Sequence, residues 1–330
     1  MVSTDLSEPF SAANRADALR RFSAGDRRFR WLTQFAAFLV VVIFAGIIVT
    51  LFIGAMPAIK AFGLDFLATS TWNPVTEKFG AFPLIYGTLV TSALAMIVAV
   101  PVGIGIAIFL TELCPRQLKR PIGIAVELLA GIPSIIYGIW GFFVFAPFFQ
   151  MTVEPWLIGF FANVPILQDL FAGPPYGIGI FTAALILSIM ILPFISSITH
   201  EVFATVPPIL KEAAYGLGCT TWEVMWRIVL PYSRAGVVGA AMLALGRALG
   251  ETMAVTFVVG NAHHINLSLL APGTTISATI ANEFTEALGA LYIPALIYAG
   301  LILFFITFLV LAAAQLMLYG LDRRSGGGSK

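Results

Sequence analysis

The chain has 330 residues, of which 59% are hydrophobic and only 11% are charged, and its mean hydropathy is +0.95. A soluble domain usually carries about 25% charged residues, so this composition excludes an ordinary soluble protein and indicates that most of the chain lies in lipid. The net charge is +1, which gives no reason to expect a nucleic-acid partner, and the positions of the charges are more informative than their sum.

Six apolar segments are long enough to cross a hydrocarbon core about 30 Å thick. They lie at roughly 32–57, 82–111, 121–149, 176–198, 235–260 and 292–320. Fifteen of the 18 Lys and Arg residues fall in the N-terminal tail, in the 112–120 and 199–234 loops, or at the C-terminus. Because cytoplasmic loops are enriched in Lys and Arg, we predict an all-α membrane protein with six transmembrane helices and both termini in the cytoplasm.

The predicted spans divide the chain into four parts. These are a basic cytoplasmic tail (1–30), the first transmembrane helix with an outside loop (31–81), a membrane core (82–320) that includes the cytoplasmic loop 199–234, and a cytoplasmic C-terminal tail (321–330). The last tail ends in Ser-Gly-Gly-Gly-Ser-Lys, which has the composition of a flexible linker and is left out of the fold prediction.

The outside loops contain aromatic and histidine residues that need an interpretation. Residues 150–175 hold Trp156 and Phe160, which are typical of a helix at the membrane interface. Residues 261–290 hold the pair His263-His264, but two glutamates are the only further ligand types nearby. A solvated loop is therefore favoured over a metal site there.

Three prolines, Pro101, Pro133 and Pro193, lie inside predicted spans. Membrane helices tolerate proline when neighbouring helices satisfy the carbonyls that it frees. The prolines therefore fit either irregular helices around a cavity or a packed bundle of bent helices. Ser134, which follows Gly131-Ile132-Pro133, adds a small polar group at a point where close packing or a passage could form.

The longest strongly polar interruption between the later spans predicts two short helices. Pro207-Pro208 opens the first over 209–217, and Gly218 is suited to end it because glycine adopts the left-handed conformation without a Cβ penalty. The second begins at Thr220 and Glu223, which have the S/T-x-x-E spacing of a capping box.

The second loop helix should end at or just before Leu230, because Pro231 follows it. Its apolar residues share one face, and they are Val224, Met225, Ile228 and Val229. That face needs a partner, which is either the chain itself or another subunit. The residues alone favour neither.

Arg247 and Glu251 are ionisable residues inside the fifth predicted span. A helix that begins near Ala235 and rises about 1.5 Å per residue puts Arg247 about 18 Å into the membrane. A charge there costs roughly 3 kcal/mol or more unless it faces protein, water or a partner charge. The i, i+4 spacing places both residues on one helix face, where they can pair. The pair is either an internal ion pair that fixes helix rotation or a polar gate for an anion, and we favour the gate.

The chain has no motif that would supply energy or catalysis. No lysine follows a glycine, so the phosphate-binding loop G-x-x-x-x-G-K-[ST] is absent, as are the H-E-x-x-H, C-x-x-C and G-x-S-x-G patterns. We therefore expect a non-catalytic membrane subunit without a cofactor of its own, driven by another chain or by a gradient.

The polar loop also carries a family signature. Glu212-Ala213-Ala214, Gly218 and Ile228-Val229-Leu230-Pro231 have the spacing E-A-A-x(3)-G-x(9)-I-x-L-P. This pattern resembles the signature of permease subunits of type I ABC importers. The resemblance implies that the loop docks into a groove of a separate ATPase subunit, and it favours the apolar face of the second loop helix as the docking surface.

Other segments are similar to one family of these permeases, the PstC subunits of phosphate importers. They include Tyr86-Gly87-Thr88-Leu89, the 127–134 and 246–255 stretches, and Leu269-Leu270-Ala271-Pro272-Gly273, within about residues 70–318. The resemblance implies a type I permease fold for the core and a role in phosphate passage for Arg247 and Glu251. Ser134 and Thr252 belong to the same stretches and are added as pathway candidates.

The same resemblance implies the partners and the location. They are a PstA-type second permease in a heterodimer, two copies of a PstB-type ATPase that bind ATP and Mg, and a PstS-type phosphate-binding protein, all at a bacterial inner membrane. An arginine within the membrane suits sulfate or molybdate as well, so the choice of phosphate rests on the resemblance.

Two other functions remain open from the residues alone. A stand-alone secondary transporter or channel would need no ATPase, and its inner loop would have no reason to expose an apolar face. A membrane-embedded enzyme would need clustered catalytic side chains. Glu112, Glu127 and His200 are the only candidates, and nothing in the sequence brings them together.

Overall fold

The computed structural model describes residues 12–165 and 167–325, and six helices among them are long and apolar enough to cross a membrane. They run over Asp26–Phe62, Phe82–Leu113, Ser134–Phe161, Ile180–Ala204, Thr221–Leu249 and Tyr292–Leu316. This part of the chain contains no strand, only two isolated bridges, Asn73 with Lys78 and Gly260 with Gly273. The predicted all-α class with six spans is confirmed.

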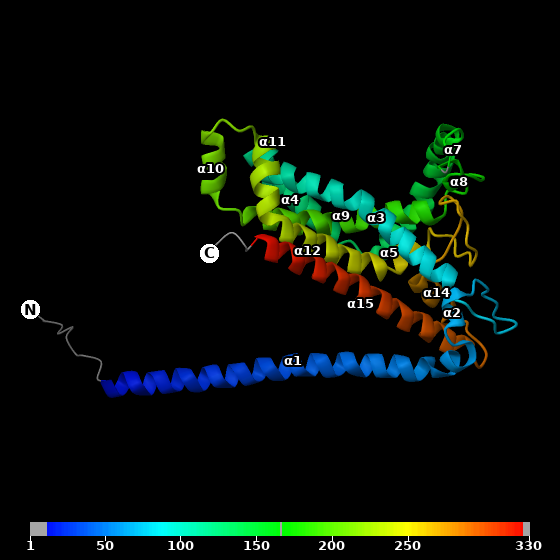
Figure 1. Ribbon diagram of the computed structural model, residues 1–330, viewed down its shortest axis with the longest axis horizontal. Coiled ribbons are helices and arrows are strands. Elements are labelled where there is room, and N and C mark those ends of the chain that lie inside the picture. The colour runs from blue at the N-terminus through cyan, green and yellow to red at the C-terminus, as the bar shows by residue number, and fades with distance from the viewer. Residues whose placement is uncertain (1–11, 166, 326–330) are drawn as a thin grey trace, which may run out of the picture. The chain divides into compact units, whose positions relative to one another are not determined.

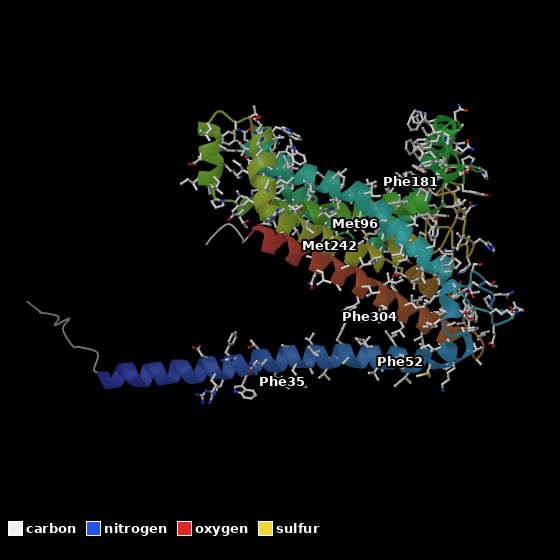
Figure 2. All side chains as sticks on the ribbon, in the orientation of Figure 1. Phe35, Phe52, Met96, Phe181, Met242 and Phe304 are labelled. Atoms are coloured by element: carbon white, nitrogen blue, oxygen red, sulfur yellow. The ribbon has the colours of Figure 1, made fainter. Side chains whose placement is uncertain are left out.

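The first helix, α1 (Ala12–Phe62), is 51 residues long and begins within the predicted tail. At 1.5 Å per residue it measures about 77 Å, so part of it must lie outside the hydrocarbon core. The described residues up to Ile53 form a unit of their own, in which the side chains of Phe35 and Phe52 are 63% and 47% exposed (Figure 2). Residues 1–11 and 326–330 of the two predicted tails lie outside the described residues.

Helix α9 (Ile180–Ala204) is the centre of the second unit, Gly54–Lys330. Its most apolar stretch is 67% buried, against 33% or less in the other spans. Helices α3 (Phe82–Ile108) and α12 (Leu230–Leu249) pack along it, and α15 (Tyr292–Ser325) packs on α12 (Figure 1).

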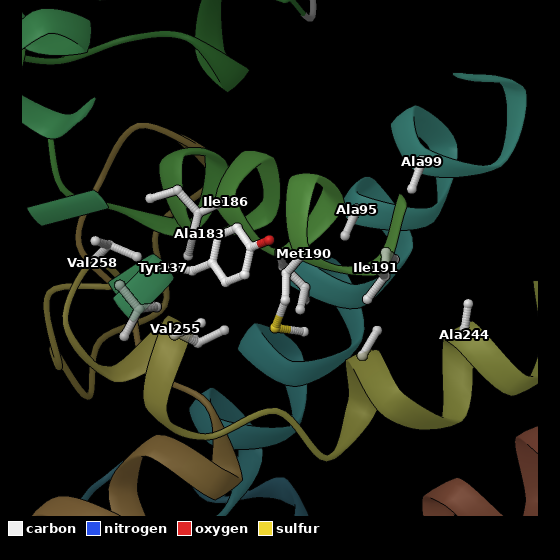
Figure 3. Packing of buried hydrophobic residues seen from close by; sticks show 14 of the residues in the cluster. Ala95, Ala99, Tyr137, Ala183, Ile186, Met190, Ile191, Ala244, Val255 and Val258 are labelled. Carbon is white, nitrogen blue, oxygen red and sulfur yellow. The ribbon is translucent and has the colours of Figure 1, made fainter. Parts of the chain in front are cut away.

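Small residues bring α3 close to α9. Ala95 and Ala99 of α3 are fully buried in one apolar cluster with Ile191 of α9 (Figure 3). One turn further on, a Cβ on Gly103 would lie only 2.8 Å from Ile195 Cγ2. Membrane helices without bulky side chains at the contact can approach in this way and gain van der Waals contact.

The third span differs from the predicted 121–149. A separate helix, α4 (Arg116–Ala130), comes first and buries none of its residues. The span itself consists of α5 (Ser134–Trp140), η2 (Gly141–Phe145), α6 (Ala146–Phe148), η3 (Phe149–Val153) and α7 (Glu154–Phe161). Pro133 causes the break, because proline lacks the N–H that would bond back to α4 and disfavours a helical residue before it.

The helix predicted at the interface within 150–175 is therefore not separate. Its main part is α7, the last two turns of the third span, and only the short α8 (Leu167–Leu170) stands apart. Trp156 and Phe160 of α7 stack on each other and are 62% and 61% exposed. These rings are placed as an aromatic belt would be.

The polar loop forms the predicted helices. The first is α10 (Pro208–Gly216), and Gly218 follows it with φ +85°, which confirms the glycine stop. The second begins at α11 (Thr221–Val224), and Thr220 with Glu223 forms the predicted capping box.

The prediction that Pro231 ends the second loop helix is wrong. A π-helical turn, η4 (Met225–Val229), leads directly into α12, and Pro231 lies in the first turn of α12. The π-turn changes which backbone carbonyls accept the helical hydrogen bonds. Proline, which has no N–H to donate, is tolerated in the first turn of a helix. The second loop helix and the fifth span are therefore one continuous helix, Thr221–Leu249.

The fifth span also ends earlier than the predicted 235–260. Helix α12 stops at Leu249 with Gly250 as its cap, and the chain resumes as α13 (Met253–Thr256). Beyond α13 the chain reaches α14 (Ile276–Glu283) without further helix. Glycine at a helix C-terminus explains the stop, as it does after α10.

The second unit has two distinct ends along its long helices (Figure 1). One end carries α10 and α11 with the basic residues of the loop, and we call it the basic end. The opposite end carries α7, α8, α14 and the short α2 (Asp65–Ala68).

Candidate functional site

The apolar face of the second loop helix is covered by its own chain. Val224 and Val229 are fully buried and Met225 is 2% exposed, in a cluster with Phe203 and Val206 at the end of α9. Ile228 is half-buried beside them. The interpretation of this face as a docking surface for another subunit is therefore wrong, because α9 and α10 already cover it.

A different set of apolar side chains is exposed at the basic end. We call it the exposed loop surface, and it consists of Ile209 (71% exposed), Tyr215 (41%), Leu217 (86%), Trp222 (64%) and Trp226 (50%). The two tryptophan rings lie 5.4 Å apart, edge to face. Large apolar side chains gathered on a polar end of a protein mark a site of interaction.

The signature residues of the loop divide between surface and core. Glu212 and Ala213 are exposed on α10, whereas Ala214 is 4% exposed and packs in the cluster with Val224. Gly218 is exposed, Leu230 is half-buried and Pro231 is exposed. The signature therefore contributes both to the buried packing of the loop and to its exposed surface.

An ion pair that the sequence did not indicate ties α10 to the end of the second span. Lys211 Nζ lies 2.5 Å from Glu112 Oε1, and the two side chains are only 17% and 14% exposed. Glu112 lies in η1 (Phe109–Leu113), which continues α3. The partners are 99 residues apart, so no local pattern could have revealed the pair. Glu112, one of the three side chains considered for a membrane-embedded enzyme, thus forms an ion pair with Lys211.

Arg247 and Glu251 do not share a helix. Arg247 lies in the last turn of α12 with an exposed side chain, whereas Glu251 follows the glycine cap and is half-buried. The ion pairs of the described residues join other side chains, and none joins these two within 4.0 Å. The expected pairing is absent, because the helix that would align the residues stops between them.

Glu251 instead contacts the first turn of the next helix. Its Oε1 accepts a hydrogen bond from the Ala254 backbone N–H at 3.2 Å, at the start of α13. A carboxylate at a helix N-terminus accepts a free N–H and interacts favourably with the helix dipole. Thr252 Oγ1 donates to the Gly250 carbonyl at 3.3 Å, which keeps the turn compact.

The breaks in the third and fifth spans lie side by side. Helices α5 and α13 pack so closely that a Cβ on Gly138 would lie 2.8 Å from the Met253 carbonyl. Ser134 is the first residue of α5 and is half-buried. Tyr137 of α5 donates to the Leu129 carbonyl at 2.9 Å, which bridges the break before α5.

Tyr137 also packs against the break in the fifth span through Val255 of α13. Its ring lies among the buried side chains of Ala183, Met190 and Val255 (Figure 3). Ser134, Thr252, Arg247 and Glu251 thus belong to two neighbouring helix breaks. Broken membrane helices commonly provide polar backbone groups along a passage.

At the opposite end, the Glu283 carboxylate contacts three other side chains. Trp72 Nε1 donates to its Oε2 at 2.8 Å, Tyr292 donates to the same oxygen at 2.7 Å, and His263 Nε2 lies 3.0 Å from Oε1. The ring of His263 stacks on Trp72 at 5.4 Å. In the loop expected to be solvated, His264 is exposed, whereas the His263 side chain is only 20% exposed.

The contacts around Glu283 change its acidity. Burial by itself raises the pKa of this carboxyl, but the close contact with His263 and the hydrogen bonds from Tyr292 and Trp72 outweigh it and hold the pKa below its ordinary value. Among the described residues no group of three or more His, Cys, Asp or Glu could hold a metal ion.

The family of the chain follows from its similarity to known proteins. The family model for the binding-protein-dependent transport system inner membrane component matches residues 99–324. The phosphate transport system permease protein PstC of Mesorhizobium japonicum is 64% identical over 318 residues, which are 96% of this chain and 97% of the relative. The chain belongs to the PstC family of transport permeases. A protein of the same name from Pasteurella multocida is 54% identical over 298 residues, which are 90% of this chain and 93% of that relative.

Solved structures show the same fold as this PstC-family chain. A bacterial ABC transporter involved in the import of the acidic polysaccharide alginate has a TM-score of 0.59 at 19% identity, covering 89% of this chain and 97% of that chain. The inward-facing MetNI methionine ABC transporter has a TM-score of 0.51 at 18% identity, with 73% and 94% covered. The type I ABC importer permease fold is confirmed.

Proposed function

We propose that this PstC-family permease forms half of the passage for inorganic phosphate in an ATP-driven importer of the bacterial inner membrane. The observation that carries the proposal is the 64% identity to a phosphate permease over nearly the whole of both chains. The second half of the passage would come from a PstA-type permease, and phosphate would be delivered by a PstS-type binding protein. The excess of Lys and Arg at the basic end orients that end toward the cytoplasm.

The exposed loop surface is where a PstB-type ATPase would dock. Two copies of that ATPase would bind ATP and Mg, and this chain would remain non-catalytic. Closure of the ATPases would move α10 and α11, and the continuous helix Thr221–Leu249 would carry the movement to Arg247. The ion pair of Lys211 with Glu112 would transmit it to the second span as well.

Arg247 is the anion contact in this proposal. Its side chain is exposed on α12 and has no carboxylate within ion-pairing distance among the described residues. A guanidinium presents several N–H donors in a planar fork that matches the oxygens of phosphate. In a medium of low polarity such a charge attracts an anion strongly.

The test is uptake of radiolabelled phosphate by cells that carry Arg247→Gln. We expect a loss of at least about 10-fold, since a charge-assisted contact contributes roughly 1.5–3 kcal/mol. Arg116→Gln, which removes an exposed arginine from α4, is the matched control and should transport normally. Labelled sulfate reports on anion selectivity. Normal phosphate uptake in Arg247→Gln would remove the anion-contact role.

A stand-alone transporter or channel is the second candidate function. It would have no use for the exposed loop surface, whose five large apolar side chains include two tryptophans. The exposure of these side chains favours the ATP-driven importer.

A further inference from the structure

A small cavity lies beside Glu251, between α3, α9 and the break after α12. Its polar lining comes from Thr88, Thr91, Ser92, Thr275 and Glu251, and apolar side chains of α9 and α12 complete it. Its empty volume is about 180 Å³, yet a water-sized sphere does not fit inside. The cavity in this conformation is thus too narrow for a free phosphate ion.

Most hydroxyls of the cavity have partners within the protein. Thr88 Oγ1 donates to the Leu84 carbonyl at 2.7 Å and accepts from the Ile276 N–H at 3.0 Å. Ser92 Oγ donates to the Thr88 carbonyl at 2.7 Å. Thr275 Oγ1 accepts from the Ala278 N–H at 3.2 Å.

Thr91 is the exception. Its side chain is 1% exposed, and its Oγ1 is buried without a hydrogen-bond partner, although its neighbours on α3 bond to carbonyls one turn earlier. A buried hydroxyl without a partner costs about 1–3 kcal/mol, and valine would fill the same volume without that cost. The Thr91 hydroxyl therefore destabilises the folded protein in this conformation.

Neither a free ion nor a water molecule fits the cavity in this conformation, which leaves the groups that line it as acceptors for Thr91. Glu251 is the one anionic group that lines the cavity. In the present conformation its Oε1 makes a single long hydrogen bond, 3.2 Å, to α13, and the described residues provide no hydrogen bond to Oε2. A carboxylate that accepts from a buried hydroxyl gains a short, charge-assisted bond.

We propose that Thr91 is a positioning residue for Glu251, which turns from the start of α13 into the cavity and accepts a hydrogen bond from Thr91 Oγ1 during transport. This inference rests on the proposed role of Arg247 and Glu251 in anion passage. With Glu251 withdrawn, its negative charge no longer opposes an anion at Arg247. When Glu251 returns, the same charge favours release of the anion.

The test uses the complete importer in proteoliposomes, with ATP-dependent uptake of labelled phosphate and thermal unfolding measured for each variant. Thr91→Val should leave the melting temperature unchanged or raise it, since it removes an unpartnered hydroxyl, yet lower uptake about 10-fold. Thr91→Ser keeps the hydroxyl and should restore most of the uptake. The matched control is Thr199→Val in α9, where another fully buried Oγ1 lacks a partner, and its uptake should be normal.

A double-mutant cycle decides whether Thr91 acts through Glu251. Thr91→Val combined with Glu251→Gln should transport no worse than Glu251→Gln alone. Multiplying defects, or a lowered melting temperature in Thr91→Val, would assign Thr91 an ordinary structural role and overturn the inference. Normal uptake in Thr91→Val beside a defect in Arg247→Gln would overturn it too, and would leave the proposed function intact. Normal uptake in Arg247→Gln would count against the proposed function instead.

Discussion

Arg247 and Glu251 stand four positions apart in the sequence, and the chain changes conformation between them. Arg247 lies in the last turn of α12 with an exposed side chain, whereas Glu251, beyond Gly250, accepts a hydrogen bond from the first turn of α13. The separation gives the two charges different environments. An arginine that is not neutralised by its neighbour is better suited to attract an anion than an internal ion pair would be.

Glu283 is the residue whose ionisation we expect to affect stability most directly. Its pKa is lowered in the folded protein, so its contribution is fully present above the ordinary value of 4.5 and is lost as the pH falls through the lower, folded pKa. We predict that the melting temperature of the purified protein falls on acidification below pH 4.5, and that Glu283→Gln lowers the melting temperature at pH 7 while weakening this acid dependence.

The control for that prediction is Glu286→Gln, which changes an exposed carboxylate three residues away. Its melting temperature and acid dependence should equal those of the unmodified protein. If Glu283→Gln shows the full acid dependence as well, the contacts of Glu283 with Trp72, Tyr292 and His263 do not set the stability of this end.

Among the secondary-structure elements, the decisive feature is the continuity of η4 with α12. A proline that ended the helix would have separated the loop from the fifth span, whereas the π-turn continues into α12, so that both belong to one helix. The loop is fixed a second time by Lys211 of α10, which contacts Glu112 at the end of the second span. Movement imposed on the loop would therefore reach two spans at once.

The contribution of the Lys211–Glu112 pair can be measured by removing one or both charges. Lys211→Met leaves Glu112 largely buried and unpaired, and should destabilise the protein by an amount between the ~1 kcal/mol of an exposed pair and the ~3 kcal/mol or more of a buried one. Lys211→Met with Glu112→Leu should recover most of the lost melting temperature. A double variant as unstable as the single one would show that the pair does not hold α10.

Across the whole molecule, exposed aromatic side chains gather at both ends of the second unit. Trp222 and Trp226 lie at the basic end, and Trp156 with Phe160 lies at the opposite end. All four aromatic side chains are at least half exposed, but the proposed roles of the two pairs differ. The first would meet an ATPase, and the second is placed as a membrane-interface belt.

We predict that Trp222→Ser reduces copurification of the ATPase subunit at least several-fold, because a central aromatic residue often dominates the free energy of binding. Trp156→Ser removes a tryptophan of nearly equal exposure, 62% against 64%, and should leave the ATPase bound. Equal recovery of the ATPase with both variants would contradict docking on the exposed loop surface.

Much of the fold followed from local patterns. The six spans, the all-α class, the glycine stop at Gly218 and the capping box of Thr220 depend on apolar length and on contacts within four residues. Such signals depend on residues that are close together in the chain, so they can be recognised in the sequence. The family signature from Glu212 to Pro231 is equally local.

Tertiary structure decided what the prolines, charges and apolar faces do. Pro133 breaks a helix while Pro231 continues one, because the outcome depends on which carbonyls and neighbouring helices accommodate the missing N–H. The apolar face of Val224 and Val229 was covered by α9, and Arg247 was separated from Glu251 by a glycine cap. The sequence by itself determined the spans and the family; packing between distant segments determined which surface stays exposed and which polar groups meet.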